Sequence, residues 1–312
     1  MSKITVLAIL GPTAAGKTEV ALSMAEEYGY EILSCDSRQI YRHMGIGTAK
    51  PSLEEMGRVR HHLIDILDPS KPYSAFAFAE DALRIIREAH KIGKKILICG
   101  GTGLYYDILV NGGGSSLDEA DLDLRDRMLE EARECGSASL HDRLRGVDPE
   151  AAEKIHPNDL QRVLRALDVY YRTGRPLSSL RKDRLPPEDI DFRAVVISLP
   201  REELYGRINR RVDVMVGRGL WSEFTNLREM GYTEASPGMA CVGYRELFGV
   251  EKGEMGLEQA AELIKRNTRR YAKRQMTWFR NRAPGALIDV SDYYMSARSI
   301  IDLTQNEGLR TR

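Results

Sequence analysis

The residues best suited to chemistry form a glycine-rich loop near the start of the chain. The loop reads Gly11-Pro12-Thr13-Ala14-Ala15-Gly16-Lys17-Thr18, which fits the pattern G-x-x-x-x-G-K-[ST]. In such a loop the backbone N–H groups turn toward phosphate oxygens, the dipole of the following helix attracts anions, and Lys17 adds a full positive charge. The hydroxyl of Thr18 is a ligand for Mg²⁺. We therefore expect a binding site for a phosphate chain with Mg²⁺, because a turn that binds nothing has little use for this array.

A carboxylate stands at a second position that suits chemistry. Asp36 follows the apolar segment Glu31–Cys35, and ligands bind at the carboxyl ends of parallel strands. Asp36 is therefore a candidate general base, and its alternative role is to cap the next turn. Ser37 and Gln39 share that structural alternative, although a Gln amide can also bind the edge of a nucleic acid base.

The carboxylate that usually positions Mg²⁺ in phosphoryl-transfer enzymes has no clear counterpart. The apolar segment Lys95–Cys99 ends in Gly100-Gly101-Thr102-Gly103 instead of Asp, although Asp65 is another candidate. These glycines allow either a helix or a substrate to come close to the backbone. A kinase that phosphorylates a small molecule or nucleoside is therefore the less favoured function, and it stays as the alternative.

A basic segment near the C-terminus predicts binding to a polyanion. Leu263–Ile288 contains no acidic residue and eight basic ones, and those from Lys265 to Arg274 fall on one half of a helix. Such uncompensated charge is repulsive unless an anion covers it, although a solvated helix face is the structural alternative. A second group between Gln161 and Arg184 is diluted by acidic residues, so RNA binding and surface ion pairing are equally compatible with it.

The elements that must position these residues follow from the spacing of the apolar residues. Strands are predicted at Ile4–Leu10, Glu31–Cys35, His61–Leu67, Lys95–Cys99, Phe192–Pro200 and Ala286–Val290. Helices are predicted at Lys17–Tyr28, Ala75–Ile92, Glu202–Val216, Gly256–Arg282 and Ser296–Asn306. Strands that alternate with helices imply an α/β fold, in which a parallel P-loop sheet has helices on both faces.

A flexible run and a charged helical stretch interrupt this alternation. Asn111–Ser116 contains three glycines and two serines, which is typical of a hinge, and the residues from about 117 to 184 are helical in pattern. We expect three parts: 1–114 as the first part of the core, 115–186 as a mainly helical insertion domain, and 187–312 as the completion of the core with basic helices.

The composition excludes several classes of protein. The 312 residues suit two domains or one domain with an insertion, and 42% hydrophobic with 29% charged residues is typical of a soluble globular chain. Four widely separated cysteines exclude a zinc site with paired ligands and a disulfide framework, which favours a cytoplasmic location. No apolar run is long enough for a membrane span, so we expect no membrane association.

Seven strings along the chain together resemble the tRNA dimethylallyltransferase family, also called tRNA isopentenyltransferases. Besides the phosphate loop they are Asp36–Arg42, Ile46–Pro51, Gly100–Tyr105, His156–Arg162, Val242–Tyr244 and Lys273–Arg280. The resemblance implies transfer of a five-carbon prenyl group from dimethylallyl diphosphate to the exocyclic amine of the adenine just 3′ of a tRNA anticodon. It implies tRNA, through its anticodon stem-loop, as the macromolecular partner, and no protein partner. A monomer is consistent with it.

The resemblance also implies roles for individual residues. Asp36 would receive the proton of the amine, Thr13 to Thr18 would hold the diphosphate with Mg²⁺, and Arg211 would be a further diphosphate clamp. Contacts with tRNA would come from Asp36, Ser37, Arg38, Gln39, Thr102, Arg125, Gln161, Arg162, Val163, Leu164, Arg165, Cys241, Val242, Gly243, Tyr244, Arg245, Lys273, Arg274 and Arg280.

The chain departs from the family pattern at a few points. Gly45 stands where relatives usually have Asp, and Arg207 and Arg210 are alternatives to Arg211 as the clamp. No cluster of cysteine and histidine follows Arg282, so the zinc finger of eukaryotic relatives is missing and the chain resembles the bacterial type. An RNA-binding switch that senses a nucleotide is a second, non-enzymatic alternative.

Overall fold

The computed structural model describes residues 3–112, 121–182, 185–282 and 286–289. The chain forms two compact units, one made of Met1–Asp107 with Glu188–Arg312 and the other of Ile108–Pro187. The expected domain boundaries near 114 and 186 remain predictions. The glycine hinge from 113 onward and the helix predicted at Ser296–Asn306 lie outside the described residues.

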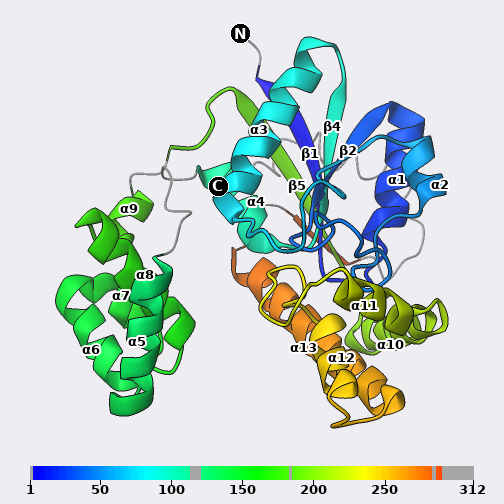
Figure 1. Cartoon of the computed structure of the whole chain (residues 1–312). Coiled ribbons are helices and arrows are strands. Elements are labelled where there is room, and N and C mark those ends of the chain that lie inside the picture. Colours follow the sequence, from blue (N-terminus) through cyan, green and yellow to red (C-terminus); the bar gives the residue numbers. More distant parts are fainter. Residues whose placement is uncertain (1–2, 113–120, 183–184, 283–285, 290–312) are drawn as a thin grey trace. The chain divides into compact units, whose positions relative to one another are not determined.

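The larger unit is built on a six-stranded sheet with the strand order β3-β2-β4-β1-β5-β6 (Figure 1). The strands are β1 (Ile4–Leu10), β2 (Tyr30–Cys35), β3 (His61–His62), β4 (Lys95–Gly100), β5 (Ile190–Ser198) and β6 (Ala286–Asp289). Every neighbouring pair is parallel, which confirms the predicted parallel sheet. Because β1 lies between β4 and β5, the loop that follows Leu10 emerges at the middle of the carboxyl edge.

The strand predicted at His61–Leu67 is wrong beyond its second residue. Leu63 and Asp65 have φ values of 61° and 55°, which place them in the left-handed region and not in an extended strand. The segment instead pairs with the chain that follows β2, because the N–H of Asp65 donates to the carbonyl of Gln39 and the N–H of Ile66 to that of Ile40.

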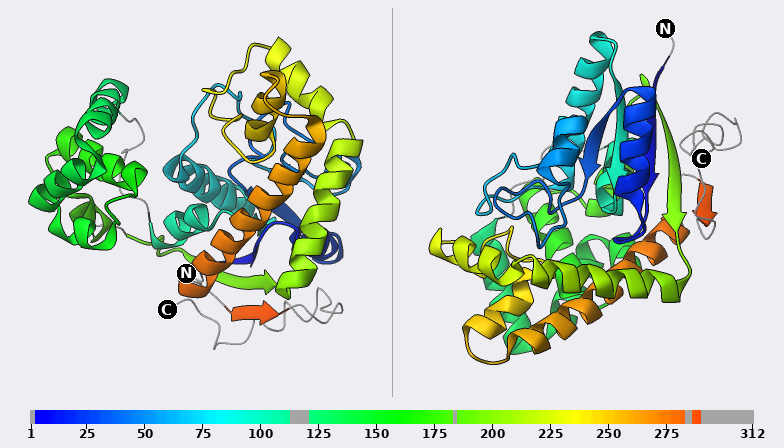
Figure 2. Two further views of the ribbon diagram at one scale, coloured as in Figure 1. Left: turned by 90° about the horizontal axis from the view of Figure 1, so that it is seen from below. Right: turned by 90° about the vertical axis from the view of Figure 1, so that its right-hand side faces the viewer.

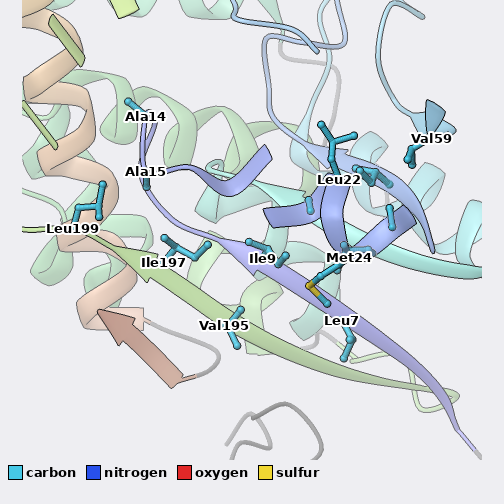
Figure 3. Close-up of a cluster of buried hydrophobic side chains, with 14 of the residues drawn as sticks. Leu7, Ile9, Ala14, Ala15, Leu22, Met24, Val59, Val195, Ile197 and Leu199 are labelled. Atoms are coloured by element: carbon cyan, nitrogen blue, oxygen red, sulfur yellow. The ribbon is translucent and has the colours of Figure 1, made fainter. Parts of the chain in front are cut away.

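Helices cover the sheet because its strands are apolar on both faces. The odd-numbered Leu7 and Ile9 pack against Leu22 and Met24 of α1 (Lys17–Tyr28), in a cluster that Figure 3 shows with Val195 and Ile197 of β5. The even-numbered Val6, Ala8 and Leu10 of β1 point to the opposite face and are also buried. Near this sheet core the unit also contains α2 (Leu53–Arg58), α3 (Ala75–Lys91) and the start of α4 (Gly103–Asn111).

A layer of helices lies beyond the carboxyl ends of the strands (Figures 1 and 2). It consists of α10 (Arg201–Gly217), α11 (Leu220–Glu229), α12 (Tyr244–Glu251) and α13 (Leu257–Arg282), and α10 packs along α13. The second and third of these were not predicted. Their apolar core includes Phe224, Tyr244, Leu247 and Ile264, so this layer has a core separate from that of the sheet.

The smaller unit is helical, as expected for the insertion. It contains α5 (Leu122–Cys135), α6 (Ser137–Val147), α7 (Pro149–Lys154), α8 (Leu160–Thr173) and α9 (Leu177–Lys182). Met128, Leu140, Leu144, Val163 and Leu167 form its core. Asp121, Asp148 and Asp159 accept hydrogen bonds from backbone N–H groups at the starts of α5, α7 and α8, which fixes where these helices begin.

Candidate active site

A cavity of about 380 Å³ opens where the phosphate loop, the residues after β2 and the layer of helices meet. Its walls contain Thr13, Lys17 and Thr18 from the loop, the run Asp36–Gln39, and residues of α10 and α13. All of them belong to the larger unit. Residues far apart in the sequence therefore share one space that is large enough for a small organic ligand.

The phosphate loop adopts a shape that only small residues allow. Gly11 has a φ of 146°, and a Cβ there would lie 2.4 Å from the carbonyl oxygen of Ile197. Gly16 has a φ of 91° and precedes α1 without capping it through a side chain. The N–H groups in the first turn of α1 are therefore available to an anion.

Two cationic side chains of the cavity, Lys17 and Arg211, have pKa values that burial lowers. The Nζ of Lys17 donates a hydrogen bond of 2.6 Å to the carbonyl of Pro12. Burial lowers the pKa of Lys17 to about 8, and nearby Arg211 acts in the same direction. Burial also lowers the pKa of Arg211, because few solvent molecules remain around its guanidinium. An anion bound between these groups would stabilise their charged forms.

Among the three arginines of α10 that could clamp an anion, the geometry favours Arg211. Its Nη1 lies 3.5 Å from the hydroxyl of Thr13, and the residue lines the cavity. Arg207 pairs with Glu203 at 2.9 Å, and Arg210 is exposed and does not line the cavity.

The geometry of Asp36 is compatible with both roles that the sequence left open. Its Oδ1 accepts hydrogen bonds from the N–H groups of Arg38 at 2.8 Å and Gln39 at 3.4 Å, as in the structural alternative. Within the described residues no hydrogen bond to its Oδ2 is found, and the side chain lines the cavity. One oxygen thus holds the turn, and the other is free to accept a proton.

The three residues that follow Asp36 form hydrogen bonds with other parts of the protein. The N–H of Ser37 donates to the hydroxyl of Thr102 at 3.1 Å, and Arg38 donates to the carbonyl of Pro237 at 2.9 Å. The amide of Gln39 accepts from Ser34 at 2.9 Å and donates to the carbonyl of Ala49 at 3.2 Å. Gln39 would have to give up these internal bonds before it could bind the edge of a base.

Residues 241–245 were expected to contact tRNA. Four of them line the cavity, and the fifth lies in the apolar core. Cys241, Val242, Gly243 and Arg245 line the cavity. Tyr244 is fully buried, and its hydroxyl donates to Glu223 at 2.6 Å. Direct contact of the Tyr244 side chain with RNA is therefore incompatible with this structure, and its role is to pack.

The basic residues of α13 fall into two groups, those engaged within the protein and those exposed to solvent. Lys265 forms ion pairs with Asp213 and Glu262, and Arg269 donates to Asn209, so these two are engaged within the protein. Arg274 lines the cavity. The remaining basic residues are exposed, and within the described part of the chain they have no ion pair: Arg266, Arg270, Lys273, Arg280 and Arg282.

In the helical unit, the expected RNA-contacting residues have unequal access to solvent. Val163 and Leu164 are buried in the core of that unit, so their side chains do not reach its surface. Arg125 donates to exposed Gln161 at 2.6 Å, and Arg165 pairs with Asp168 at 3.1 Å. The exposed Arg162 pairs with Asp159 at 3.3 Å, so an RNA phosphate would compete with a carboxylate there.

The wall of the cavity contains a few oxygen atoms that could bind a hard cation. The Thr18 hydroxyl and the carboxylates of Glu19 and Asp36 line the cavity. No group of three or more His, Cys, Asp or Glu side chains suited to a metal occurs among the described residues. This arrangement suits Mg²⁺, which keeps water ligands and binds substrate phosphates. Asp65, the other candidate carboxylate, accepts a hydrogen bond from Lys50 and does not line the cavity.

Sequence reasoning missed two residues that shape the cavity. The carboxylate of Glu223 accepts the N–H groups of Gly45, Ile46 and Gly47 at 2.7–2.9 Å, which fixes the loop leading to the cavity wall. Gln275 joins the phosphate loop to the turn after β4. Glu223 lies in no recognisable pattern, whereas Gln275 lies in the string Lys273–Arg280, which the resemblance assigns to contact with tRNA. The lack of acidic residues after Glu262 in α13 could have drawn attention to the uncharged side chain of Gln275.

Comparison with known proteins gives a consistent result. A model of the IPP transferase family matches residues 39–282. A tRNA dimethylallyltransferase of Geobacter sulfurreducens is 46% identical over 280 residues, which cover 89% of this chain and 90% of the relative. One from Acetivibrio thermocellus is 46% identical over 276 residues, or 88% of each chain.

Solved structures agree with these relatives. A tRNA isopentenylpyrophosphate transferase from Bacillus halodurans superposes with a TM-score of 0.70 at 39% identity, covering 97% of this chain and 95% of its own. A eukaryotic dimethylallyltransferase acting on tRNA gives a TM-score of 0.79 at 28% identity, covering 93% of this chain and 75% of its own. Within the described ranges, no helix combines the length and apolar character that a membrane crossing requires.

Proposed function

Because this chain belongs to the IPP transferase family of tRNA dimethylallyltransferases, we propose that it prenylates tRNA at the adenosine just 3′ of the anticodon. The donor is dimethylallyl diphosphate, and the acceptor is the exocyclic amine of the adenine. A tRNA substrate also favours a cytoplasmic location.

One observation carries this proposal: a phosphate cradle and a carboxylate with a free oxygen face the same cavity. Lys17, Thr18 and Arg211 surround the place for a diphosphate, and Asp36 lies on the wall beside them. The cavity also has an apolar side formed by Val212, Met215 and Ile264, to which a five-carbon chain is suited.

The chemistry is a displacement at an allylic carbon. The amine nitrogen forms a bond to the first carbon of the dimethylallyl group while the bond from that carbon to the diphosphate oxygen breaks. The electron pair leaves with the diphosphate, whose growing charge is stabilised by Lys17, Arg211 and the N–H groups of α1. The amine becomes acidic as its lone pair is used, and its proton passes to Oδ2 of Asp36.

The cation fits this scheme as an aid to the leaving group. Mg²⁺, when bound, neutralises charge on the diphosphate, and Thr18 is the residue that would hold it. Lys17 and Arg211 lie in the cavity whether or not the cation is present, so part of the charge stabilisation comes from the protein.

The adenine must leave its stack to reach this cavity. Extrusion of a base costs a few kcal/mol, and least in a flexible loop, so phosphate contacts elsewhere must offset it. The exposed arginines and lysine of α13 suit that purpose. Arg125, Gln161 and Arg162 of the helical unit provide a second set of polar groups.

The test is a transfer assay with the purified protein, dimethylallyl diphosphate, Mg²⁺ and unmodified tRNA. We expect one adenosine to gain the mass of a dimethylallyl group, and diphosphate to be released in equal amount. Formation of ADP from ATP without prenylated tRNA would instead support the kinase alternative. Binding of tRNA with neither product would support the RNA-binding switch.

A further inference from the structure

A single buried amide joins three segments around the phosphate cradle. The Oε1 of Gln275, on α13, accepts a hydrogen bond of 3.0 Å from the N–H of Thr13 in the phosphate loop. Its Nε2 donates a bond of 2.8 Å to the carbonyl of Gly101, in the turn after β4. The residue is only 7% exposed. Three parts of the chain far apart in sequence therefore meet at one functional group.

The chemistry of the two partners fixes the orientation of this amide. An N–H on one side requires an oxygen acceptor, and a carbonyl on the other side requires an N–H donor. Rotation of the amide by 180° would face donor with donor and acceptor with acceptor. Among the side chains of this length, only Gln satisfies both partners while carrying no charge into a cavity for an anion.

The absence of a side chain at Gly101 leaves room for the amide of Gln275. A Cβ on Gly101 would lie 2.5 Å from Nε2 of Gln275 and 3.0 Å from the carbonyl oxygen of Gly11. The amide therefore occupies the space that a side chain would need, directly against the start of the phosphate loop.

We infer that Gln275 is a positioning residue for the phosphate loop, and that it acts from the inner face of the helix whose outer face carries the exposed basic residues. Its bond to Thr13 holds the loop residue whose hydroxyl lies 3.5 Å from Arg211, so it sets the spacing between cradle and clamp. This inference rests on the proposed function. It assigns Gln275 to the diphosphate end of the site, although the residue lies within the run Lys273–Arg280 expected to contact tRNA.

The inference can be tested by separating the two substrates. Gln275→Met keeps the length and volume of the side chain but leaves the N–H of Thr13 without an acceptor in a buried place. We expect the dissociation constant for inorganic diphosphate with Mg²⁺, measured by calorimetry, to rise by about tenfold. The KM for dimethylallyl diphosphate should rise in parallel, while the affinity for tRNA stays within about twofold.

The matched control is Gln259→Met, which makes the same substitution at an exposed position on the first turns of α13. It should leave both affinities unchanged. If Gln275→Met does not fold, Gln275→Asn keeps the polar group but is one methylene too short to reach both partners, and its diphosphate affinity should also fall.

Each result has a defined meaning. Equal diphosphate binding by the wild type and both Gln275 variants would overturn the inference and leave the proposed function intact. Loss of tRNA affinity with unchanged diphosphate binding would also overturn it, and would make Gln275 an RNA contact. If the wild-type protein itself binds neither diphosphate nor dimethylallyl diphosphate, the proposed function fails first.

Discussion

At Asp36 the two oxygens of one carboxylate have different surroundings, and this difference predicts how variants behave. Asn keeps Oδ1, which accepts from Arg38 and Gln39, but it cannot take up a proton at the other atom. We expect Asp36→Asn to lower the single-turnover rate of prenyl transfer by a factor of about 10² or more, while tRNA affinity is nearly retained. Collapse of affinity with persistent turnover of the bound tRNA would make Asp36 a binding residue instead.

The lowered pKa of Lys17 predicts a dependence of diphosphate binding on pH. An anion binds best to the charged ammonium, whose pKa in the free protein is about 8. Below this pH the lysine is already protonated, so affinity should change little. Above it, binding must be accompanied by proton uptake, and the dissociation constant should rise by up to tenfold per pH unit. The last ionisation of inorganic diphosphate falls in the same pH range, so the contribution of Lys17 is obtained by comparison with a variant whose cation does not titrate there.

The measurement is a calorimetric titration of inorganic diphosphate between pH 7 and 9.5. Lys17→Arg is the control, because a guanidinium remains charged over this range and its curve therefore reports only the ionisation of the ligand, even though the geometry is less suitable. A wild-type curve that runs parallel to the Lys17→Arg curve would show that the charge of Lys17 does not contribute to binding.

At the scale of elements, α13 presents two faces with separate tasks. Its inner face bears Gln275 and the cavity-lining Tyr271, and its outer face bears the exposed basic residues Arg266, Arg270 and Lys273. Spacings of three and four residues place these three on one side of the helix. Charges that have no internal partner are the ones available to RNA phosphates.

This division predicts how the salt dependence of tRNA binding responds to substitution. We expect the triple variant Arg266→Ala, Arg270→Ala, Lys273→Ala to flatten the log-log salt slope by nearly one unit for each lost phosphate contact. Lys265→Ala is the matched control, because Lys265 is already paired with Asp213 and Glu262 and its loss should leave the slope unchanged. Filter binding from 50 to 300 mM salt measures both, and equal slopes for wild type and triple variant would contradict the assignment.

The elements also show what sequence can predict and what it cannot. The phosphate loop and Asp36 follow from a local string and from the rule that ligands bind at carboxyl ends of parallel strands, so both could be placed in advance. The burial of Tyr244 and the bonds of Glu223 to the loop at 45–47 depend on side chains that meet only after folding. The strand predicted beyond His62 failed because apolar spacing does not reveal the left-handed residues Leu63 and Asp65.

At the scale of the whole molecule, each unit has its own core. All residues that line the cavity belong to the larger unit. The apolar cluster of the helical unit, from Leu124 to Leu177, contains no residue of the sheet. Catalytic chemistry and the helical unit are thus separable on physical grounds, although the proposed function requires tRNA to be held for transfer.

The chain enters and leaves the helical unit at neighbouring points, which makes a direct test feasible. A Cβ on Gly112 would lie 2.1 Å from the carbonyl oxygen of Leu185, so the two backbones are in contact. Replacing residues 113–184 by three or four glycines should therefore leave the sheet and the cavity intact. We expect the shortened protein to bind inorganic diphosphate within about threefold of the wild type, because none of the ligands is removed.

The same protein should bind tRNA much more weakly, because Arg125, Gln161, Arg162 and Arg165 are lost together while the basic face of α13 remains. Nearly one unit should be lost from the salt slope for each phosphate contact that the helical unit makes. Thermal unfolding with and without diphosphate reports whether the larger unit has folded, since a bound ligand raises its stability. If diphosphate stabilises the shortened protein and tRNA affinity is undiminished, the helical unit does not contribute to RNA binding, and the exposed face of α13 must supply it alone.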